Sequence, residues 1–398
     1  MAKTRTQVAI IGAGPAGLLL GQLLHNVGID SIILEARDRV YVENRIRAGV
    51  IEHGSAQTLI EAGVGARMQR EGLIHHGIEL LFQGQRHRID FQALTGKYVT
   101  VYGQHEIVKD MIAARLATSR PLHFEVENVL LLDIESDAPR VIYRKDGVEH
   151  EITCDFIAGC DGFHGISRDA FPKGAITGYE KTYPFAWLGI LAEAPPAGEE
   201  LVYAQHERGF ALFSMRSPTI TRLYLQVEPD EDPANWPDDR IWEELHRRLE
   251  TRDGWRLNEG KIIQKGVTAM RSFVAEPMRH GRLLLAGDAA HIVPPTGAKG
   301  MNLAIADVRR LSQALQAFYG RASQQGIDEY SPQCLKRIWK AQQFSGWMTS
   351  LLHCFQEDSM FERKRQSALL DYVVNSRAAA TGLAENYVGL PYEETLSE

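Results

Sequence analysis

The chain has 398 residues and a formal net charge of −7, and 44% of its residues are hydrophobic and 24% charged. This is an ordinary globular composition, large enough for two cores, and the acidic balance gives no reason to expect a nucleic-acid partner. No apolar run reaches the length of about 18 residues that predicts a transmembrane helix, and the first strand begins too early to leave room for a signal peptide. Four cysteines without a CxxC pair favour reduced thiols in the cytoplasm, and we expect no metal site.

The N-terminal region predicts a dinucleotide-binding unit. A buried strand over residues 8–11 is followed by a helical apolar pattern and by a second buried strand over residues 31–34, which ends on Glu35. Strand, helix, strand and terminal acid together are typical of the βαβ unit that binds FAD or NAD(P), where the acid accepts from a ribose hydroxyl. The motif alone leaves both cofactors open.

Three glycines between the first strand and the helix have GxGxxG spacing. Gly12 permits a tight turn, Gly14 lets a pyrophosphate approach the backbone, and Gly17 lets the helix pack closely on the strand. The helix that follows offers unpaired N–H groups and the positive end of its dipole to the phosphates.

The segment after Glu35 alternates charged and apolar residues until a helix begins near Gly54. Its two arginines, Arg45 and Arg47, are interpreted either as a solvated basic face or as guanidiniums aimed at phosphates. Residues 100–116 predict a strand end followed by a helix, with Gln104 at the junction, where a side chain can face a ligand.

Alternating residues from 126 to 157 predict strands with a turn at Asp146-Gly147. The segment FIAGCDGFHGISR, residues 156–168, predicts a strand that ends in Cys160-Asp161-Gly162 and is followed by a helix. Residues 180–270 then read as aromatic-rich antiparallel strands, with an amphipathic helix over 238–250. This region predicts a second, sheet-based domain that closes over a pocket beside the dinucleotide.

The chain returns to the first domain with a strand over residues 283–286 that ends in Gly287-Asp288. Asp288 is placed to accept from a ribitol or ribose hydroxyl. An extended Pro294-Pro295 loop leads to a helix that begins near Met301 and whose N-terminus suits an anionic group. Residues 302–377 read mainly as helices, and residues 386–394 predict a short extended tail whose Tyr387 reaches back into a site.

Three segments, GAGPAG, CDGFHGISR and AGDAAHIVPPTGAKGMN, together resemble the motifs of the flavin-dependent aromatic hydroxylases, the class A monooxygenases. The likeness extends over essentially the whole chain. The additional segments RIRAGV and ENYVGLPYEE resemble the members of that family that hydroxylate 4-hydroxybenzoate at C3 to 3,4-dihydroxybenzoate. The resemblance implies FAD, NADPH or NADH, O2 as co-substrate, a flavin C4a-hydroperoxide, and a cytoplasmic homodimer.

The resemblance also implies an α/β (α+β) fold, in which a Rossmann-like FAD domain is joined to an antiparallel substrate domain and a helical C-terminal region. We expect the FAD domain in three parts, residues 1–75, 101–180 and 271–320. The substrate domain is expected over residues 181–270 with an insertion over 76–100, and the helical interface region over 321–398.

A proton relay is implied for the reaction. Tyr203 matches the tyrosine that contacts the 4-hydroxyl of the substrate, and the backbone carbonyl of Pro295 matches a second contact to that oxygen. Tyr387 matches the next member of the relay and His75 the histidine at its solvent end, where a group that titrates near the working pH can drain the proton.

Carboxylate binding is implied for Ser214, Arg216 and Tyr224, and Arg222 matches an arginine near the flavin. Arg216 can grip a carboxylate with two N–H groups, and the two hydroxyls can donate to it. Ser214 and Arg216 are two residues apart on a predicted strand and project from one face. The alternative is that Arg216 and Arg222 belong to a structural charge pair.

For the cofactors, the resemblance implies two residue sets. The FAD set is Gly12, Gly14, Ala16, Gly17, Glu35, Arg45, Arg47, Gln104, Asp161, Asp288, Gly300, Met301 and Asn302. The nicotinamide set is Arg37, Arg39, Tyr41, Arg45, His164 and Arg271. Ala36 replaces an arginine that helps to select NADPH in relatives, so the choice between NADPH and NADH is open, with NADPH expected.

Two alternatives stay open at this point. One is hydroxylation of another aromatic acid such as 3-hydroxybenzoate, against which the pair Tyr203 and Tyr387 argues. The other is a flavin reductase that does not use O2, against which the absence of a second GxGxxG argues.

Overall fold

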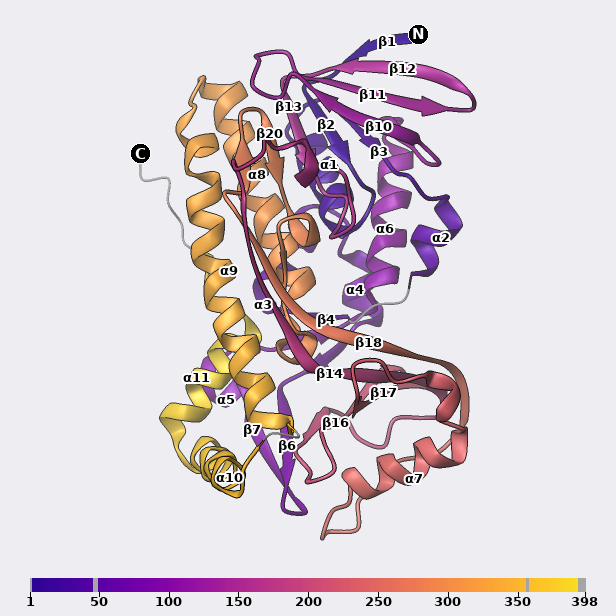
Figure 1. Cartoon of the computed structure of the whole chain (residues 1–398), viewed down its shortest axis with the longest axis vertical. Coiled ribbons are helices and arrows are strands. Elements are labelled where there is room, and N and C mark those ends of the chain that lie inside the picture. The colour runs from indigo at the N-terminus through magenta and orange to yellow at the C-terminus, as the bar shows by residue number, and fades with distance from the viewer. Residues whose placement is uncertain (1, 46–48, 356–357, 393–398) are drawn as a thin grey trace.

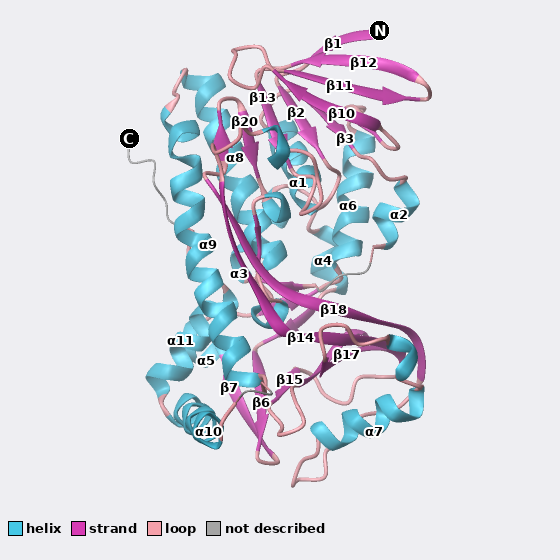
Figure 2. Cartoon of the chain, in the orientation of Figure 1, coloured by secondary structure: helices cyan, strands magenta, loops and turns pink. Residues whose placement is uncertain are grey.

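The computed structural model describes residues 2–45, 49–355 and 358–392. The molecule is elongated, with a sheet-and-helix half at the top of Figure 1 and a second sheet at the bottom. Two long strands, β14 (Thr177–Glu193) and β18 (Lys261–Glu276), run from one half to the other, and they pair along most of their length. Figure 2 shows these strands as the main link between the halves, beside the long helix α9 (Gln325–Leu352).

The upper half is organised around a six-stranded sheet in which neighbouring strands are parallel except at the β19 edge. Its order is β19 (Arg279–His280), β20 (Leu283–Leu285), β13 (Phe156–Gly159), β2 (Val8–Ile11), β3 (Ser31–Leu34) and β9 (Leu122–His123). The central strands are continuous apolar runs because both faces of the parallel sheet are covered. Three helices lie side by side on it, with α1 (Pro15–Asn26) in contact with both α6 (Gln104–Ala117) and α8 (Gly300–Arg321). Buried residues of a second sheet, Val141, Tyr143 and Ile152, belong to the same core.

Two smaller sheets and three short helices complete this half. The four-stranded sheet is β1 (Ala2–Arg5), β12 (Val148–Thr153), β11 (Arg140–Lys145) and β10 (Glu127–Leu132). The three-stranded sheet is β4 (Val50–Ile51), β8 (Val99–Val101) and β5 (Leu73–His75). The helices are α2 (Arg39–Asn44), α3 (His53–Glu61) and α4 (Ala66–Glu71), while a further short helix, α5 (Phe91–Thr95), lies in the lower half.

The lower half holds an eight-stranded sheet. Its order is β21 (His291–Ile292), β18, β14, β17 (Ile220–Val227), β16 (Ala211–Ser217), β15 (Leu201–Ala204), β6 (Gly77–Phe82) and β7 (Gln85–Asp90). One face packs on α7 (Asp238–Arg248). The other packs on α5, α9, α10 (Met360–Asn375) and α11 (Arg377–Val388), so its side chains face the interior of the molecule.

Most predicted elements are confirmed, including both strands and the helix of the βαβ unit, the strands from 126 to 157, and the helix within 238–250. Two predictions are wrong. No α-helix follows Cys160-Asp161-Gly162, where the chain forms a loop and the 3-10 turn Arg168–Ala170 because the Asp161 carboxylate accepts the Ser167 N–H at 2.9 Å. Residues 386–388 are helical rather than extended, since Leu383, Ala384, Tyr387 and Val388 continue the buried face of α11.

The Pro294-Pro295 segment is only partly extended. Pro294 has an extended backbone, but Pro295–Gly297 is a 3-10 turn that leads into α8. No helix in the described part of the chain is long and apolar enough to cross a membrane.

Candidate active site

The glycine-rich turn after β2 is packed too tightly for side chains at two positions. Gly12 has φ +103°, and an added Cβ would lie 2.4 Å from the Cys160 carbonyl oxygen. A Cβ on Gly17 would lie 2.0 Å from the Gly12 carbonyl oxygen. These contacts confirm the predicted turn and the close packing of α1 on the sheet.

Gly14 differs from its neighbours because an added Cβ would meet no atom within 4 Å. It precedes α1, whose first N–H groups have no intrahelical partner. Beside it, the Glu35 carboxylate accepts the Ala13 N–H at 2.8 Å through one oxygen and the Arg37 N–H at 2.8 Å through the other. Open space, free N–H groups and an anchored carboxylate fit the pyrophosphate and ribose of a dinucleotide.

The N-terminus of α8 offers a second set of N–H groups, on Gly300, Met301 and Asn302. The Asn302 side chain is already committed, because its Nδ2 donates to the carbonyls of Val50 (3.0 Å) and Ala298 (2.8 Å) and its Oδ1 accepts the Glu52 N–H (2.9 Å). What Asn302 can offer a flavin is therefore its backbone.

Two aspartates stand at strand ends on the same edge of the sheet. Asp161 follows β13, and its Oδ2 accepts from the Ser167 backbone and hydroxyl while its Oδ1 is buried without a partner. Burial raises the pKa of Asp161. Asp288 follows β20 and is exposed, and a Cβ on the preceding Gly287 would lie 3.3 Å from Ala16. Both carboxylates are placed to meet polar groups of a cofactor.

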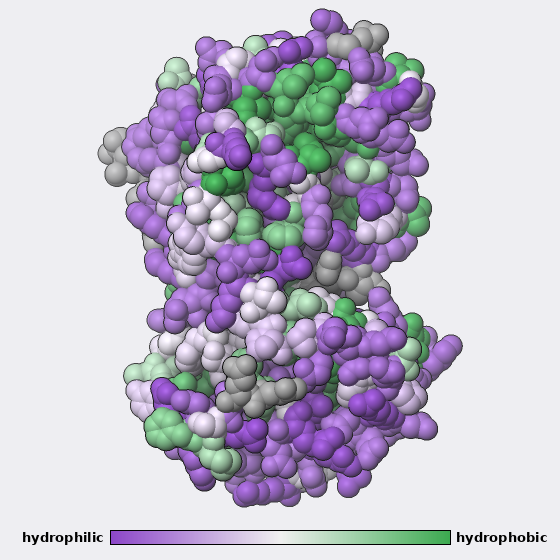
Figure 3. Space-filling model, in the orientation of Figure 1, coloured by the Kyte–Doolittle hydropathy of each residue, from purple (hydrophilic) through white to green (hydrophobic). Residues whose placement is uncertain are grey.

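The remaining predicted FAD residues lie at element ends. Gln104 is the first residue of α6 and is half-buried, and Arg45 follows α2 and is exposed. Arg47 lies outside the described residues. Figure 3 shows hydrophobic residues gathered on the visible face of the upper half, where Figure 1 labels α1 and β2.

The structure brings Tyr203 and Tyr387 together. Their hydroxyl oxygens are 2.6 Å apart, and the two residues are 2% and 1% exposed. Tyr203 lies on β15, while Tyr387 lies on α11 with its ring stacked on Phe91 at 5.0 Å between centroids. Burial raises the pKa of both phenols, so both are neutral at working pH and can pass a proton only by exchanging hydrogen bonds.

His75 is buried rather than exposed to solvent, and its place at the solvent end of this pair stays a prediction. It is 1% exposed on β5, and its Nδ1 has no hydrogen-bond partner in the described part of the chain. Burial lowers the pKa of His75 to about 4, so the ring is neutral and is a weaker proton acceptor than an exposed histidine. Its membership of the relay remains a prediction.

A cationic group occupies the same sheet face as Tyr203. Across β15, β16 and β17, Tyr203 pairs with Leu212, and Leu212 pairs with Tyr224. Two residues further along β16, on the same face, Ser214 pairs with Arg222; we call each such set of paired residues a row. Residues that alternate along paired strands share a face, so Tyr203, Ser214, Arg222 and Tyr224 point the same way. Arg216 lies at a register shift between Met215 and Ser217, and its guanidinium joins this group through the Tyr224 hydroxyl.

Several N–H groups of the guanidiniums in this group have no hydrogen-bond acceptor among the described residues. Arg216 Nε and Arg222 Nε and Nη1 are buried without a partner, and no carboxylate in the described part of the chain lies within ion-pair distance of either residue. This argues against the structural charge pair. Burial raises the pKa of Tyr224, but Arg222 and Arg216 outweigh burial and lower it below its ordinary value. The Ser214 hydroxyl donates to the Arg222 carbonyl at 2.9 Å. The group as a whole suits a carboxylate.

Pro295 is exposed at the start of its 3-10 turn, and its carbonyl accepts the Ala298 N–H at 2.9 Å. A carbonyl has two lone pairs, so one remains for a ligand.

The predicted nicotinamide residues form two groups. His164 and Arg271 meet around the Phe163 ring, at 5.0 Å between ring centroids and 4.9 Å from guanidinium to centroid. Arg37, which precedes α2, lies over the Tyr41 ring with its guanidinium 5.3 Å from the ring centroid. Arg39 is in an ion pair with Glu43, with Nε and Oε1 2.6 Å apart.

Sequence reasoning missed a buried ion pair next to the site. Lys299 Nζ lies 2.6 Å from Glu52 Oε1, and the two side chains are 5% and 6% exposed. Lys299 precedes α8 and Glu52 precedes α3. No local spacing could reveal a pair 247 residues apart, although both ends adjoin predicted motifs. The described residues include no group of three metal-ligating side chains placed to hold an ion.

Comparison with known proteins shows what the chain is similar to. A family model described as an FAD binding domain matches residues 5–345. The p-hydroxybenzoate hydroxylase of Acinetobacter baylyi is 53% identical over 394 residues, which is 99% of this chain and 97% of that protein. A 3-(3-hydroxy-phenyl)propionate/3-hydroxycinnamic acid hydroxylase of a Mycobacterium species is 27% identical to this chain. The aligned region is 82% of this chain and 57% of that protein.

Solved structures share the fold. The p-nitrophenol 4-monooxygenase of Pseudomonas putida superposes with a TM-score of 0.84 at 19% identity, covering 98% of this chain and 100% of that one. The aklavinone-11 hydroxylase, solved with FAD and aklavinone, has a TM-score of 0.72 at 20% identity, covering 87% of this chain and 69% of that one.

Proposed function

The chain belongs to the family of FAD-dependent aromatic hydroxylases, and from that premise we propose that it hydroxylates 4-hydroxybenzoate at C3 to give 3,4-dihydroxybenzoate. The observation that carries the substrate assignment is that one sheet face has neutral hydroxyl groups at one end and positively charged groups at the other. The buried hydroxyl pair of Tyr203 and Tyr387 forms one end, and the unpartnered guanidinium donors of Arg216 and Arg222 form the other.

The spacing of these ends suits a para-substituted ring. Tyr203 and Ser214 lie in successive same-face rows of the sheet, and such rows are about 7 Å apart along the strands. A benzene ring with a hydroxyl and a carboxylate in para positions has comparable length. A meta-hydroxyl would fall beside the ring axis rather than opposite the carboxylate, which argues against 3-hydroxybenzoate.

Each residue has a task in this proposal. Arg216 and Arg222 neutralise and orient the carboxylate, with Ser214 and Tyr224 beside them. Tyr203 accepts the hydrogen bond of the substrate phenol, and its own proton moves to Tyr387, so that the ring gains phenolate character. The Pro295 carbonyl is the second contact to the phenol oxygen, and His75 is the neutral base beyond Tyr387.

The FAD set described above fits a flavin dinucleotide at the strand ends, with Glu35 at the ribose and the α8 N-terminus at the ring. When bound, FAD supplies the transfer of electrons from the nicotinamide and the activation of O2. The chain's own part is to bind, to orient and to exclude water. For the nicotinamide, we propose NADPH, held by the exposed arginines in and just before α2, Arg45, His164 and Arg271.

Three further proposals follow the family. The FAD domain comprises residues 1–75, 101–180 and 271–320 and the substrate domain 76–100 and 181–270, which is supported by β6 and β7 joining the eight-stranded sheet. A cytoplasmic location is supported by the buried free thiols of Cys154, Cys160 and Cys334.

A homodimer is supported by α10, which exposes four large apolar side chains: Met360, Phe361, Leu369 and Tyr372.

The test is the product made from 4-hydroxybenzoate with NADPH or NADH, measured together with oxygen uptake. One 3,4-dihydroxybenzoate per NADPH and per O2 is expected. Nicotinamide oxidation without oxygen uptake would instead indicate a reductase. If only 3-hydroxybenzoate gave one hydroxylated product per NADPH, then 3-hydroxybenzoate would be the substrate. The same panel with benzoate, which lacks a phenol, should give no hydroxylated product.

A further inference from the structure

The chain after α11 is held against the body of the molecule by a group of contacts that we call the C-terminal latch, residues 389–392 with their partners. Gly389 ends α11 with φ +98°, and an added Cβ would lie 2.3 Å from Glu52 Oε2. Only glycine allows this turn against the buried Glu52 carboxylate. The latch therefore begins immediately after the helical turn that carries Tyr387.

Two cations bind the backbone on either side of that turn. Lys299 Nζ donates to the Asn386 carbonyl and, at 3.3 Å, to the Tyr387 carbonyl. Arg337 Nη1 donates to the carbonyls of Leu390 (3.0 Å) and Pro391 (3.2 Å). Glu52 joins the two cations, with Oε1 2.6 Å from Lys299 and Oε2 3.3 Å from Arg337. These bonds satisfy carbonyls that a helix end leaves unpaired.

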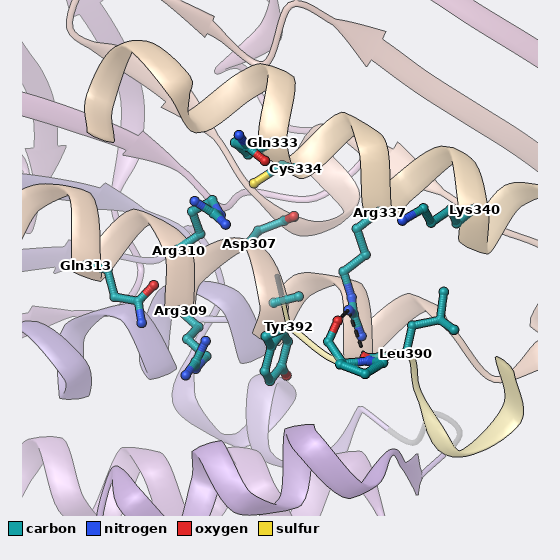
Figure 4. Close-up of a pocket in the computed structure, with 12 residues that line it drawn as sticks. Asp307, Arg309, Arg310, Gln313, Gln333, Cys334, Arg337, Lys340, Leu390 and Tyr392 are labelled. Atoms are coloured by element: carbon teal, nitrogen blue, oxygen red, sulfur yellow. Dashed lines mark hydrogen bonds between the residues drawn. The ribbon is translucent and has the colours of Figure 1, made fainter. Parts of the chain in front are cut away.

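Tyr392 closes the latch. Its ring lies between two guanidiniums, with Arg309 at 4.5 Å and Arg337 at 4.8 Å from the centroid, as Figure 4 shows. On α3, Gly54 leaves room for the ring, since an added Cβ would lie 3.0 Å from its edge. The Tyr392 hydroxyl is buried beside Ser55 and Thr58, and it makes no hydrogen bond of ordinary geometry within the described part of the chain. The anchor is thus the aromatic face and not the hydroxyl.

We propose that Tyr392 is a positioning residue for the proton relay: the latch holds the end of α11 so that the Tyr387 hydroxyl meets Tyr203. Tyr387 is one residue from the end of α11, where a helix frays unless it is held. A hydroxyl contact of 2.6 Å tolerates little displacement, and small misplacements far from the chemistry reduce rates by up to about a hundredfold. This inference rests on the relay role given to Tyr203 and Tyr387.

The experiment compares Tyr392→Leu with Tyr392→Phe in the FAD-loaded enzyme. For each variant, the pH at which bound 4-hydroxybenzoate ionises is read from its ultraviolet difference spectrum, and product per NADPH is measured. Leucine should raise the ionisation midpoint by about one pH unit, a tenfold loss of phenolate at a given pH, and should lower product per NADPH. The KM for 4-hydroxybenzoate should change little, because the carboxylate group is untouched. Phenylalanine keeps the aromatic face and should restore wild-type values.

A second readout does not depend on catalysis. Hydrogen exchange of the α11 amides should accelerate in Tyr392→Leu and not in Tyr392→Phe. Arg309→Gln should give a smaller effect of the same kind, and it should add little to Tyr392→Leu, since both remove one contact. Tyr179→Leu is the matched control, because that ring packs edge-on against Trp339 at 5.7 Å.

The outcomes separate the latch from the relay. If Tyr203→Phe shifts the ionisation midpoint and Tyr392→Leu does not, the relay stands and the latch proposal is overturned. Equal losses in Tyr392→Phe and Tyr392→Leu would also overturn it, because the hydroxyl has no partner to lose. If Tyr203→Phe itself leaves ionisation and coupling unchanged, the relay fails, and α11 exchange alone then tests the latch.

Discussion

Burial governs the chemistry of the single residues in this site. Tyr203 and Tyr387 are shielded from water, and the pKa of each phenol is raised by that burial. On the same sheet face, Arg216 and Arg222 keep unpartnered donors, and they lower the pKa of Tyr224 against the effect of burial. The same apolar surroundings thus hold neutral proton carriers at one end and uncompensated positive charge at the other.

Tyr203→Phe tests the phenol end. The variant should still oxidise NADPH in response to substrate, but product should fall and hydrogen peroxide should replace it, because a neutral phenol is a poor nucleophile. Peroxide and 3,4-dihydroxybenzoate are measured in the same reaction. Tyr319→Phe is the control, since it removes a hydroxyl that donates to Asp155 at 2.9 Å, outside the site. Wild-type coupling in Tyr203→Phe would remove the role assigned to that hydroxyl.

Arg216→Ala tests the carboxylate end. A buried charge that loses its partner is destabilised by about 3–5 kcal/mol, which corresponds to at least two decades in Kd for 4-hydroxybenzoate. Binding is measured by titration of the flavin absorbance. A phenol without a carboxylate should bind the variant and the wild type almost equally. The same loss for both ligands would mean that Arg216 supports the fold instead.

Arg37→Ala and Arg39→Ala test the nicotinamide choice. Arg39 is already paired with Glu43, whereas Arg37 lies over Tyr41, so Arg37 is the better candidate for the 2′-phosphate. Losing one exposed contact should weaken kcat/KM for NADPH about fivefold, since such pairs are worth about 1 kcal/mol. Arg39→Ala should have the smaller effect, and Ala36→Arg should improve NADPH alone. A wild-type enzyme that prefers NADH tenfold would contradict the assignment.

Among the elements, a buried ion pair fixes α8 to the strand end that carries Asp288. Asp307 Oδ2 on α8 accepts from His291 Nε2 on β21 at 2.6 Å and from the Gly287 N–H at 2.9 Å. His291 and Asp307 are 1% and 2% exposed. Burial alone would lower the pKa of His291, but Asp307 outweighs burial and raises it. The helix N-terminus and the aspartate turn therefore keep a fixed relation.

This pair makes stability depend on pH. Because the folded-state pKa of His291 is raised, the stabilisation is complete below the unfolded value of about 6.5 and is lost as pH rises through the folded-state pKa. The Tm difference between wild type and His291→Gln should therefore shrink from pH 6 to pH 9. His280→Gln is the control, because its pair with Glu135 is exposed to solvent and contributes little. A Tm difference that is constant or grows would contradict the prediction.

At the scale of the whole molecule, β14 and β18 connect the FAD-binding half to the substrate sheet, and α9 to α11 pack across the second face of that sheet. Tyr203 comes from the sheet and Tyr387 from the helices, so the relay exists only where the two layers meet. The outer side of α10 remains uncovered, with Met360 and Phe361 each 69% exposed.

Phe361→Glu tests the homodimer. A charge in the centre of an apolar contact should shift the protein from dimer to monomer in sedimentation equilibrium at micromolar concentration, because the buried charge would have no partner. Val148→Glu, at the hairpin turn between β11 and β12 and 51% exposed, should leave the dimer intact. A monomeric wild type, or an unchanged dimer in Phe361→Glu, would exclude α10 as the interface.

Local pattern was sufficient for the elements and for part of the site. The βαβ unit was predictable because its contacts lie within about thirty residues, and glycine spacing reports backbone geometry directly. Strand alternation predicted one face for Ser214 and Arg216, although the register shift at Met215–Ser217 means that contact with Tyr224, and not alternation, places Arg216 in the group. Resemblance to a family supplied the pairing of Tyr203 with Tyr387, which no periodicity contains.

Tertiary structure decided the rest, because burial and long-range contact are properties of the packed chain. The Tyr203–Tyr387 contact joins residues 184 apart, and the pair of Lys299 with Glu52 joins residues 247 apart. His75 follows a charged surface helix in sequence but lies buried, which lowers its pKa to about 4. The helical state of residues 386–388 likewise depends on packing against α5 and on the turn at Gly389, and sequence alone favoured an extended tail.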